Sequence, residues 1–360
     1  MMGQSHGDSA GLPFSRYCSQ RVLLFLLLAF CFQAILLASF RFFSPATHRF
    51  PISSPSARPF SNFTEESSSD PLCEYITDPS DTLVVVKTGA NEIYDKLPTQ
   101  LLTSLACYDD LLIFSDLEQD LGPYHVYDAL DNVTEAIKRD DPVFEYYRTL
   151  QQYHELGEDI SSLKTTTGQA AWNLDKYKFL HMLEKSWNLR PRRKWYVFIE
   201  ADTYLIRSNL LRWLERLNSS QPLYLGSPTF VNNEGFAHGG SGFILSGEAM
   251  SKFAEGDPGV AARYDEGVRH EQFGDYMLMK ALREKGVDFH GVWPMLQAEK
   301  PSTIPFGPGP NNGVRHSCQP IVTMHHITPE EASNIWRFEQ QRHNTTVRFP
   351  SVSSISRLCS

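Results

Sequence analysis

The sequence predicts an α/β domain that binds its ligand at the carboxyl ends of its strands and that follows an N-terminal membrane helix. Short β-branched segments alternate with helical segments through most of the chain, which is typical of a sheet covered by helices. A long uncharged apolar run lies near the N-terminus. The composition of 41% hydrophobic and 21% charged residues excludes a disordered chain, a collagen-like repeat and a coiled coil.

Charge and cysteine content exclude two further classes of protein. The formal net charge is −9 and the pI is about 5.7, whereas a nucleic-acid-binding protein needs clustered basic surface. We therefore expect no nucleic-acid partner. Six Cys in 360 residues are too few for a fold held together mainly by disulfides. The length allows two domains or one large α/β domain, and we find no internal repeat.

The apolar run, Val22–Phe40, is predicted to be a transmembrane helix. About 20 apolar residues cross the hydrocarbon core of a bilayer, whereas the apolar core of a cleavable signal peptide has about 7–15. The bulky segment Arg41–Phe43 follows the run in place of a cleavage site with small residues. We therefore expect an uncleaved signal anchor behind a cytosolic tail of residues 1–21, with a cleaved peptide as the alternative. Residues 41–72 are rich in Ser and Pro, which is typical of a stem.

The remaining body, residues 73–360, is expected to lie in an oxidising lumen. Arginines flank both sides of the apolar run, so charge does not orient it. Four N-x-S/T sequons follow the run, at Asn62, Asn132, Asn218 and Asn344. Four of the six Cys also follow it and can form two disulfides there. Three pairings are possible, and proximity in the sequence favours Cys73 with Cys107 and Cys318 with Cys359.

The elements of this body are read from β-branched runs and helical periodicity. The run Thr82–Thr88 predicts a strand that is buried on both faces. Ser208 is the expected N-cap of a helix that ends at Leu217. Further helices are expected near Pro98–Cys107 and Gly168–Asn188. Further strands are expected at Leu111–Asp116, Trp195–Asp202, Leu223–Leu225, Phe243–Ser246 and Ile321–His326.

Two carboxylates follow the strand that begins at Trp195. Side chains two positions apart on an extended chain point the same way, so Glu200 and Asp202 can face one divalent cation. Such an oxygen-rich site suits Mn²⁺ or Mg²⁺ bound to a diphosphate. A solvated acidic strand end is the alternative at this point of the sequence.

Five segments, taken together in this order, resemble glycosyltransferase family 31, in its fringe-like and core 1 β-1,3-galactosyltransferase branch. The resemblance covers roughly Thr82–Gln341. It is carried by the segments VVVKTGAN, WYVFIEADTYLIRSNLLRWL, HGGSGFILSGEAM, QFGDYMLMKAL and PIVTMHHITPEE. The resemblance implies a GT-A fold, which is a Rossmann-like mixed sheet that binds a UDP-sugar with a divalent metal, and it implies inversion at the anomeric carbon.

The resemblance also assigns the metal site. The acidic triplet of the family falls on Glu200, Ala201 and Asp202. Asp202 is the expected main ligand, Glu200 keeps an acid, and the middle acid is lost. The metal-associated His of the family falls on His325. Neighbouring strand residues point to opposite faces, so we expect His326 to point away from the site.

The same resemblance places the catalytic base at Asp275, with Glu271 and Asp265 as weaker candidates. An inverting transferase needs one base to take the proton of the acceptor hydroxyl. Gly239 and Gly240 belong to a turn where bare backbone lets a sugar approach, and a tight turn alone would also explain them. Nucleotide contacts are expected from Thr88 and Asp116, which end two strands, although ordinary strand-closing residues are an equal alternative. Two aromatic residues could stack on a sugar or lie in the core: Trp172 and Trp293.

The expected activity is that of a UDP-sugar-dependent hexosyltransferase. Transfer of galactose from UDP-galactose to glycoprotein O-glycans is favoured, because PIVTMHHITPEE is more similar to the core 1 branch. The alternatives are fringe-like transfer of N-acetylglucosamine and a non-catalytic lumenal chaperone or glycan-binding relative. A glycoside hydrolase would leave the glycine turn and His325 unexplained. Topology and family together predict a single-pass type II protein of the Golgi membrane. The acceptor loop Gly307–Arg315 has no readable specificity code, and the oligomeric state is not encoded in any motif.

Overall fold

The computed structural model describes residue 73 and residues 81–304 and 319–344 of the chain. All of them belong to one compact unit, residues 68–360. None of the helices in this part of the chain is long and apolar enough to cross a membrane. Four expected features lie outside the described residues: the helix Val22–Phe40, the stem, the pair Cys318–Cys359 and the loop Gly307–Arg315.

The described residues build an eight-stranded mixed sheet in the order β11-β7-β10-β5-β1-β2-β4-β3. Its strands are β1 (Thr82–Lys87), β2 (Leu111–Ser115), β3 (Gln119–Leu121), β4 (Tyr124–Asp128), β5 (Trp195–Glu200), β7 (Tyr224–Gly226), β10 (Phe243–Ser246) and β11 (Phe289–Gly291). The central strand β1 runs parallel to β2 and to β5, and Lys87 pairs in register with Phe114 and with Glu200. The carboxyl ends of these three strands therefore meet at one edge of the sheet.

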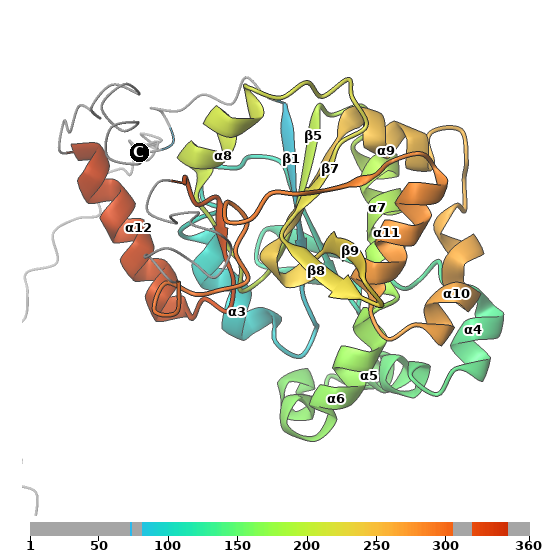
Figure 1. Ribbon diagram of the computed structural model, residues 1–360. Helices are drawn as coiled ribbons and strands as arrows, with labels where there is room; N and C mark the ends of the chain where they lie inside the picture. The colour runs from blue at the N-terminus through green and yellow to red at the C-terminus, as the bar shows by residue number, and fades with distance from the viewer. Residues whose placement is uncertain (1–72, 74–80, 305–318, 345–360) are drawn as a thin grey trace, which may run out of the picture. The chain divides into compact units, whose positions relative to one another are not determined.

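Helices cover both faces of this sheet (Figure 1). They are α3 (Ile93–Leu101), α4 (Glu135–Asp140), α5 (Phe144–Leu156), α6 (Lys164–Asp175), α7 (Lys178–Leu189), α8 (Arg207–Leu214), α9 (Gly247–Ala254), α10 (Asp265–His270), α11 (Gly274–Glu284) and α12 (Pro329–Asn344). Along β1, Val85 packs with residues of α7, α9 and α11, whereas Val84 and Val86 pack with residues of α3 and α8. The run Leu83–Val86 within β1 is apolar at every position, as burial on both faces requires.

The predicted strands of the central sheet are confirmed, and that at Phe243–Ser246 has the expected bounds. The helical stretch expected at Gly168–Asn188 is two helices, α6 and α7, and the one expected near Pro98–Cys107 is α3, which begins earlier and ends at Leu101. Ser208 is not an N-cap. Helix α8 begins at Arg207, so Ile206 occupies the N-cap position. The N–H of Ile206 donates a hydrogen bond to the carbonyl of Val322, which holds the start of the helix beside the segment that precedes β12.

Two small sheets stand apart from the main one. The strand expected at Ile321–His326 is only β12 (Thr323–Met324), and it pairs with β6 (Tyr204–Leu205). A hairpin that we did not predict joins β8 (Pro228–Val231) to β9 (Glu234–Ala237). Its two loop residues, Asn232 and Asn233, have φ angles of 50° and 64°. Asparagine is one of the residues that best tolerate such a left-handed two-residue turn, so the sequence did hold this signal.

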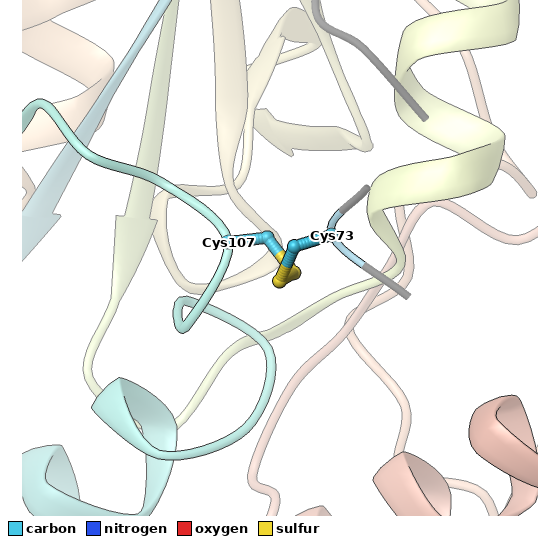
Figure 2. The surroundings of a disulfide bond; sticks show 2 residues. All are labelled: Cys73 and Cys107. Carbon is cyan, nitrogen blue, oxygen red and sulfur yellow. A yellow bond between two sulfur atoms is a disulfide. The ribbon is translucent and has the colours of Figure 1, made fainter. Parts of the chain in front are cut away.

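The expected disulfide between Cys73 and Cys107 is present (Figure 2). It ties the segment before β1 to the turns that follow α3, across a sequence separation of 34 residues. Two sequon residues, Asn132 and Asn218, are exposed. The disulfide suits a chain that folds in an oxidising compartment, and the two Asn side chains are accessible for glycosylation.

Candidate functional site

A cavity of about 690 Å³ lies where the carboxyl ends of β1, β2 and β5 meet. Its volume is in the range of about 300–1,000 Å³ that is usual for small-molecule sites. Helices α6 and α11, the β8–β9 hairpin and the residues after β12 complete its wall. Seven of the site residues expected from the sequence line it: Thr88, Asp116, Glu200, Asp202, Gly240, Asp275 and His325. The eighth, Gly239, does not line it but donates its N–H to Asp275.

Asp202, His325 and His326 form a cluster with one potential metal-binding atom each, all within 4.8 Å of one another. His325 Nε2 lies 3.2 Å from Asp202 Oδ1, and His326 Nδ1 lies 3.9 Å from Asp202 Oδ2. The expectation that the two His point to opposite faces is wrong. Strand β12 ends at Met324, and His326 has a left-handed φ of 57°, so the two rings lie 3.8 Å apart between centroids.

Glu200 lies outside this cluster, although the resemblance made it a metal ligand. One of its carboxylate oxygens lies 3.1 Å from Lys87 Nζ and the other lies 3.7 Å from His325 Nε2. Lys87 also forms an ion pair with Asp175. Burial lowers the pKa of Lys87, but the two carboxylates outweigh it and raise the pKa above its ordinary value. Glu200 is therefore one partner of a buried cation.

The atoms of the three-residue cluster fit a divalent cation. Asp202 Oδ1 and His325 Nδ1 are buried and have no hydrogen-bond partner among the described residues, since the 3.2 Å contact between Oδ1 and Nε2 lacks hydrogen-bond geometry. Burial lowers the pKa of His325, but the carboxylates of Asp202 and Glu200 raise it to about 9. This imidazole is thus drawn toward carrying a positive charge at the place where a cation would lie.

A short glycine turn connects this cluster with the candidate base. Thr203 Oγ1 donates to the carbonyl of Gly240 at 2.7 Å, and the N–H of Gly239 donates to Asp275 Oδ2 at 2.8 Å. A Cβ on Gly240 would lie 2.2 Å from Cε1 of His325. Glycine is therefore required here because the imidazole ring packs directly on the backbone. The requirement comes from packing at the site and not only from turn geometry.

Asp275 lies in the first turn of helix α11, and its side chain lines the cavity. Burial raises the pKa of its carboxyl from 3.8 to about 6, against the lowering effect of the N–H groups of Gly239 and Tyr276. A carboxylate with a pKa near neutrality is suited to accept a proton during a reaction. The weaker candidates do not line the cavity. Asp265 accepts hydrogen bonds from His181 and from the N–H of Thr134, and Glu271 pairs with Lys280.

The expected nucleotide contacts differ in how their side chains are engaged. Thr88 is buried, and its hydroxyl has no hydrogen-bond partner among the described residues. Asp116 accepts the N–H of Ala90 at 2.7 Å and lies 3.2 Å from Lys178 Nζ. Thr88 therefore has a free hydroxyl for a ligand. Asp116 is held through Oδ1, while its Oδ2 pairs with Lys178 but has no hydrogen-bond partner among the described residues.

Sequence reasoning missed the lysines of this site. Lys87, Lys96 and Lys178 all line the cavity and pair with its carboxylates. The available signal was Lys87 itself, because a charged residue at the end of an apolar buried strand needs a partner. Of the two expected aromatic residues, Trp172 lines the cavity and is 49% exposed, and Trp293 does not line it.

Comparisons with known proteins agree with this site. Residues 148–279 match the family described as Fringe-like. Over 160 residues the chain is 26% identical to a Xenopus laevis protein named glycoprotein-N-acetylgalactosamine 3-beta-galactosyltransferase 1. The matched region covers 38% of this chain and 43% of that protein. The chain therefore spans less than half the length of this relative. The Fringe-like match includes Asp202, the glycine turn and Asp275. Together with the galactosyltransferase match, it confirms the resemblance of the chain to the fringe-like branch of glycosyltransferase family 31.

Proposed function

We propose that the protein is an inverting, UDP-sugar-dependent β-1,3-glycosyltransferase with a GT-A fold that transfers galactose to glycoprotein O-glycans. One observation carries the proposal. A carboxylate of raised pKa and a cluster of metal-ligand side chains line the same cavity and are joined by one glycine turn. The name of the Xenopus laevis relative supports galactose as the sugar.

In this reaction Asp275 takes the proton of the acceptor hydroxyl while that oxygen attacks C1 of the sugar. The new C1–O bond forms on the face opposite UDP, and the electron pair of the old C1–O bond leaves with the diphosphate. The N–H groups of Gly239 and Tyr276 hold the two oxygens of the base in place, and each oxygen keeps a lone pair for the acceptor proton. Asp202 and His325 would hold Mn²⁺ or Mg²⁺, which when bound neutralises the charge of the diphosphate.

The cavity offers contacts for the rest of the donor and the acceptor. We assign the uridine to the strand ends at Thr88 and Asp116, which line the cavity. Trp172 and Phe230 also line it and are exposed, at 49% and 67%. Exposed aromatic rings at the wall of a polar cavity suit the apolar face of a sugar ring, so we assign the acceptor glycan to this side.

We further propose that the enzyme is a single-pass type II protein of the Golgi membrane, anchored by Val22–Phe40 with its catalytic domain in the lumen. The disulfide Cys73–Cys107 and the exposed sequons at Asn132 and Asn218 support a lumenal location. Protection of the body from protease in intact microsomes, together with loss of mass on enzymatic removal of N-glycans, is the expected result. Cleavage of the body without detergent would contradict this topology.

The test of the activity uses the full-length chain, purified in detergent from a secretory host. UDP release is measured with UDP-galactose and UDP-N-acetylglucosamine, in Mn²⁺ and in EDTA, with and without a glycopeptide acceptor that carries N-acetylgalactosamine. We expect acceptor-dependent release from UDP-galactose in Mn²⁺ only, abolished in Asp202→Ala. Release from UDP-N-acetylglucosamine alone would identify a fringe-like activity. Glycan binding without turnover on any donor would identify a non-catalytic relative.

A further inference from the structure

We propose that the metal site consists of Asp202, His325 and His326 without Glu200, and that this set selects Mn²⁺, Co²⁺ and Zn²⁺ against Mg²⁺ and Ca²⁺. The proposal rests on the metal dependence contained in the proposed function. It departs from the ligand set that the sequence predicts, in which Glu200 is a ligand and His326 is not.

Glu200 is already engaged by a buried cation. Strands β1 and β5 pair Lys87 directly with Glu200, and their charged atoms lie 3.1 Å apart. The side chain of Lys87 is 7% exposed. Moving the Glu200 carboxylate onto a metal at Asp202 would weaken this pair and leave the interior charge of Lys87 to Asp175 alone, which is unfavourable. Glu200 therefore compensates the charge of a buried lysine.

His326 is placed to act as the third metal ligand in place of Glu200. Its left-handed backbone brings Nδ1 to 3.9 Å from Asp202 Oδ2, on the same side as His325. Its side chain is 68% exposed and its ring contacts that of His325, at 3.8 Å between centroids, so turning the ring onto a cation costs at most part of that contact. Asp202 Oδ1 has no hydrogen-bond partner among the described residues, and His325 Nε2 lies 3.2 Å from it. Three ligand atoms thus converge from two segments, the turn after β5 and the residues after β12.

A lysine competes for the same carboxylate. Lys96 Nζ lies 3.1 Å from Asp202 Oδ2 and 2.9 Å from Glu92. The side chain of Lys96 is 30% exposed, and Glu92 lies one helical turn away from it. A cation that binds Asp202 can therefore displace Lys96, which keeps its pair with Glu92. Lys96 therefore neutralises Asp202 before the metal binds and remains paired with Glu92 afterwards.

The donor set determines the preference among metals. Imidazole nitrogens bind Zn²⁺, Co²⁺ and other transition metals well, whereas Mg²⁺ and Ca²⁺ prefer oxygen ligands. Two imidazoles and one carboxylate favour the transition metals. We expect the affinity for Mn²⁺ to be lower than that for Co²⁺, as in the general affinity series of divalent metals. A site of Glu200, Asp202 and His325 would instead offer two carboxylates and would accept Mg²⁺ more readily.

The test measures metal binding on the full-length protein in the absence of any donor sugar. Calorimetric titration with Mn²⁺, Co²⁺ and Mg²⁺ is carried out on the natural protein and on His326→Ala, Glu200→Gln and the control His290→Ala, whose side chain is exposed and does not line the cavity. We expect His326→Ala to weaken Co²⁺ and Mn²⁺ binding by about tenfold or more. Loss of a residue that only supports a ligand already lowers metal affinity by about tenfold or more, and loss of a ligand should lower it at least as much. Glu200→Gln removes only an outer contact of His325 and should weaken binding less than His326→Ala does. His290→Ala should change binding by less than about threefold, and Co²⁺ should bind more tightly than Mg²⁺.

Pulsed electron paramagnetic resonance of bound Mn²⁺ gives a second readout that does not depend on folding yield. We expect nitrogen couplings from two imidazoles in the natural protein and from one in His326→Ala. Binding that is insensitive to His326→Ala but weakened tenfold by Glu200→Gln would overturn the proposal. If Co²⁺ and Mn²⁺ bind more tightly than Mg²⁺ but the protein releases UDP from no donor, the proposed function is refuted and the proposed metal site is still supported.

Discussion

Replacing Asp275 by Asn removes a partly buried charge, and we expect it to abolish transfer while stabilising the protein at neutral pH. The ordinary pKa of this carboxyl is 3.8, and burial raises it to about 6. The folded protein therefore holds the proton more tightly than the unfolded chain. The protonated form contributes stability that is complete below about pH 4 and is lost as the pH rises through about 6.

The magnitude follows from the pKa and from the two hydrogen bonds of the carboxylate. At about 1.4 kcal/mol per pH unit, ionisation in the folded state costs about 3 kcal/mol of stability above pH 6. The N–H groups of Gly239 and Tyr276 donate to different oxygens of Asp275, and an Asn has only one acceptor oxygen. Losing one of these bonds costs about 1 kcal/mol. The net gain is thus about 1–2 kcal/mol at pH 7.5, which raises Tm by roughly 2–8 °C in a domain of this size.

The assay is thermal unfolding of the natural protein and of Asp275→Asn in EDTA at pH 5 and at pH 7.5. We expect the substitution to raise Tm at pH 7.5 and to leave it unchanged or lower at pH 5. Asp265→Asn is the control, because Asp265 accepts hydrogen bonds from His181 and from the N–H of Thr134. This control should lower Tm at both pH values. An equal effect of Asp275→Asn at both pH values, or a loss of stability at pH 7.5, would refute the reasoning.

Three further perturbations test the site and its support. Gly240→Ala places a Cβ 2.2 Å from the His325 ring, so calorimetry should show Mn²⁺ binding weakened by about tenfold or more. The double substitution Cys73→Ser/Cys107→Ser opens a loop of sequence separation 34, and denaturant unfolding should show a loss of about 4 kcal/mol from the entropy of loop closure. Lys87→Met leaves two partly buried carboxylates without their cation, and the free energy of unfolding should fall by about 1–3 kcal/mol.

Each of these has a result that would contradict it. Gly168→Ala is the control for Gly240→Ala, since a Cβ there meets nothing within 4 Å, and equal metal binding by both variants would show that the His325 ring does not need Gly240. Unchanged unfolding of the serine variant would mean that the disulfide constrains no part of the unfolded chain. Full stability of Lys87→Met would show that Glu200 does not need this lysine and is free to bind metal.

The central sheet could be predicted from the sequence because its strands are buried on both faces. A run such as TLVVVK is apolar at nearly every position, so its type and its place in the sheet follow from local pattern alone. The polar residues that end these strands, among them Asp202, then fall at one edge by the geometry of parallel strands. Most of the candidate site follows from this step.

The arrangement within the site could not be predicted in the same way. The partner of Lys87, Asp175, lies 88 residues away in the sequence, and no local pattern joins them. His326 was expected to point away because strand alternation was applied to a residue that follows the strand. Its left-handed φ of 57° depends on the turn into α12 and reverses the direction of the ring. Pairings between distant segments and single backbone reversals are set by tertiary packing.

Metal-dependent UDP release tests the central claim most directly. The full-length natural protein, Asp202→Ala and Asp275→Asn are assayed with UDP-galactose and an N-acetylgalactosamine glycopeptide, in Mn²⁺ and in EDTA, with unfolding curves to show that each is folded. The account predicts release by the natural protein in Mn²⁺ only, no release by Asp202→Ala, and none by Asp275→Asn although it still binds UDP. Full transfer by folded Asp275→Asn, or equal release in EDTA, would contradict it.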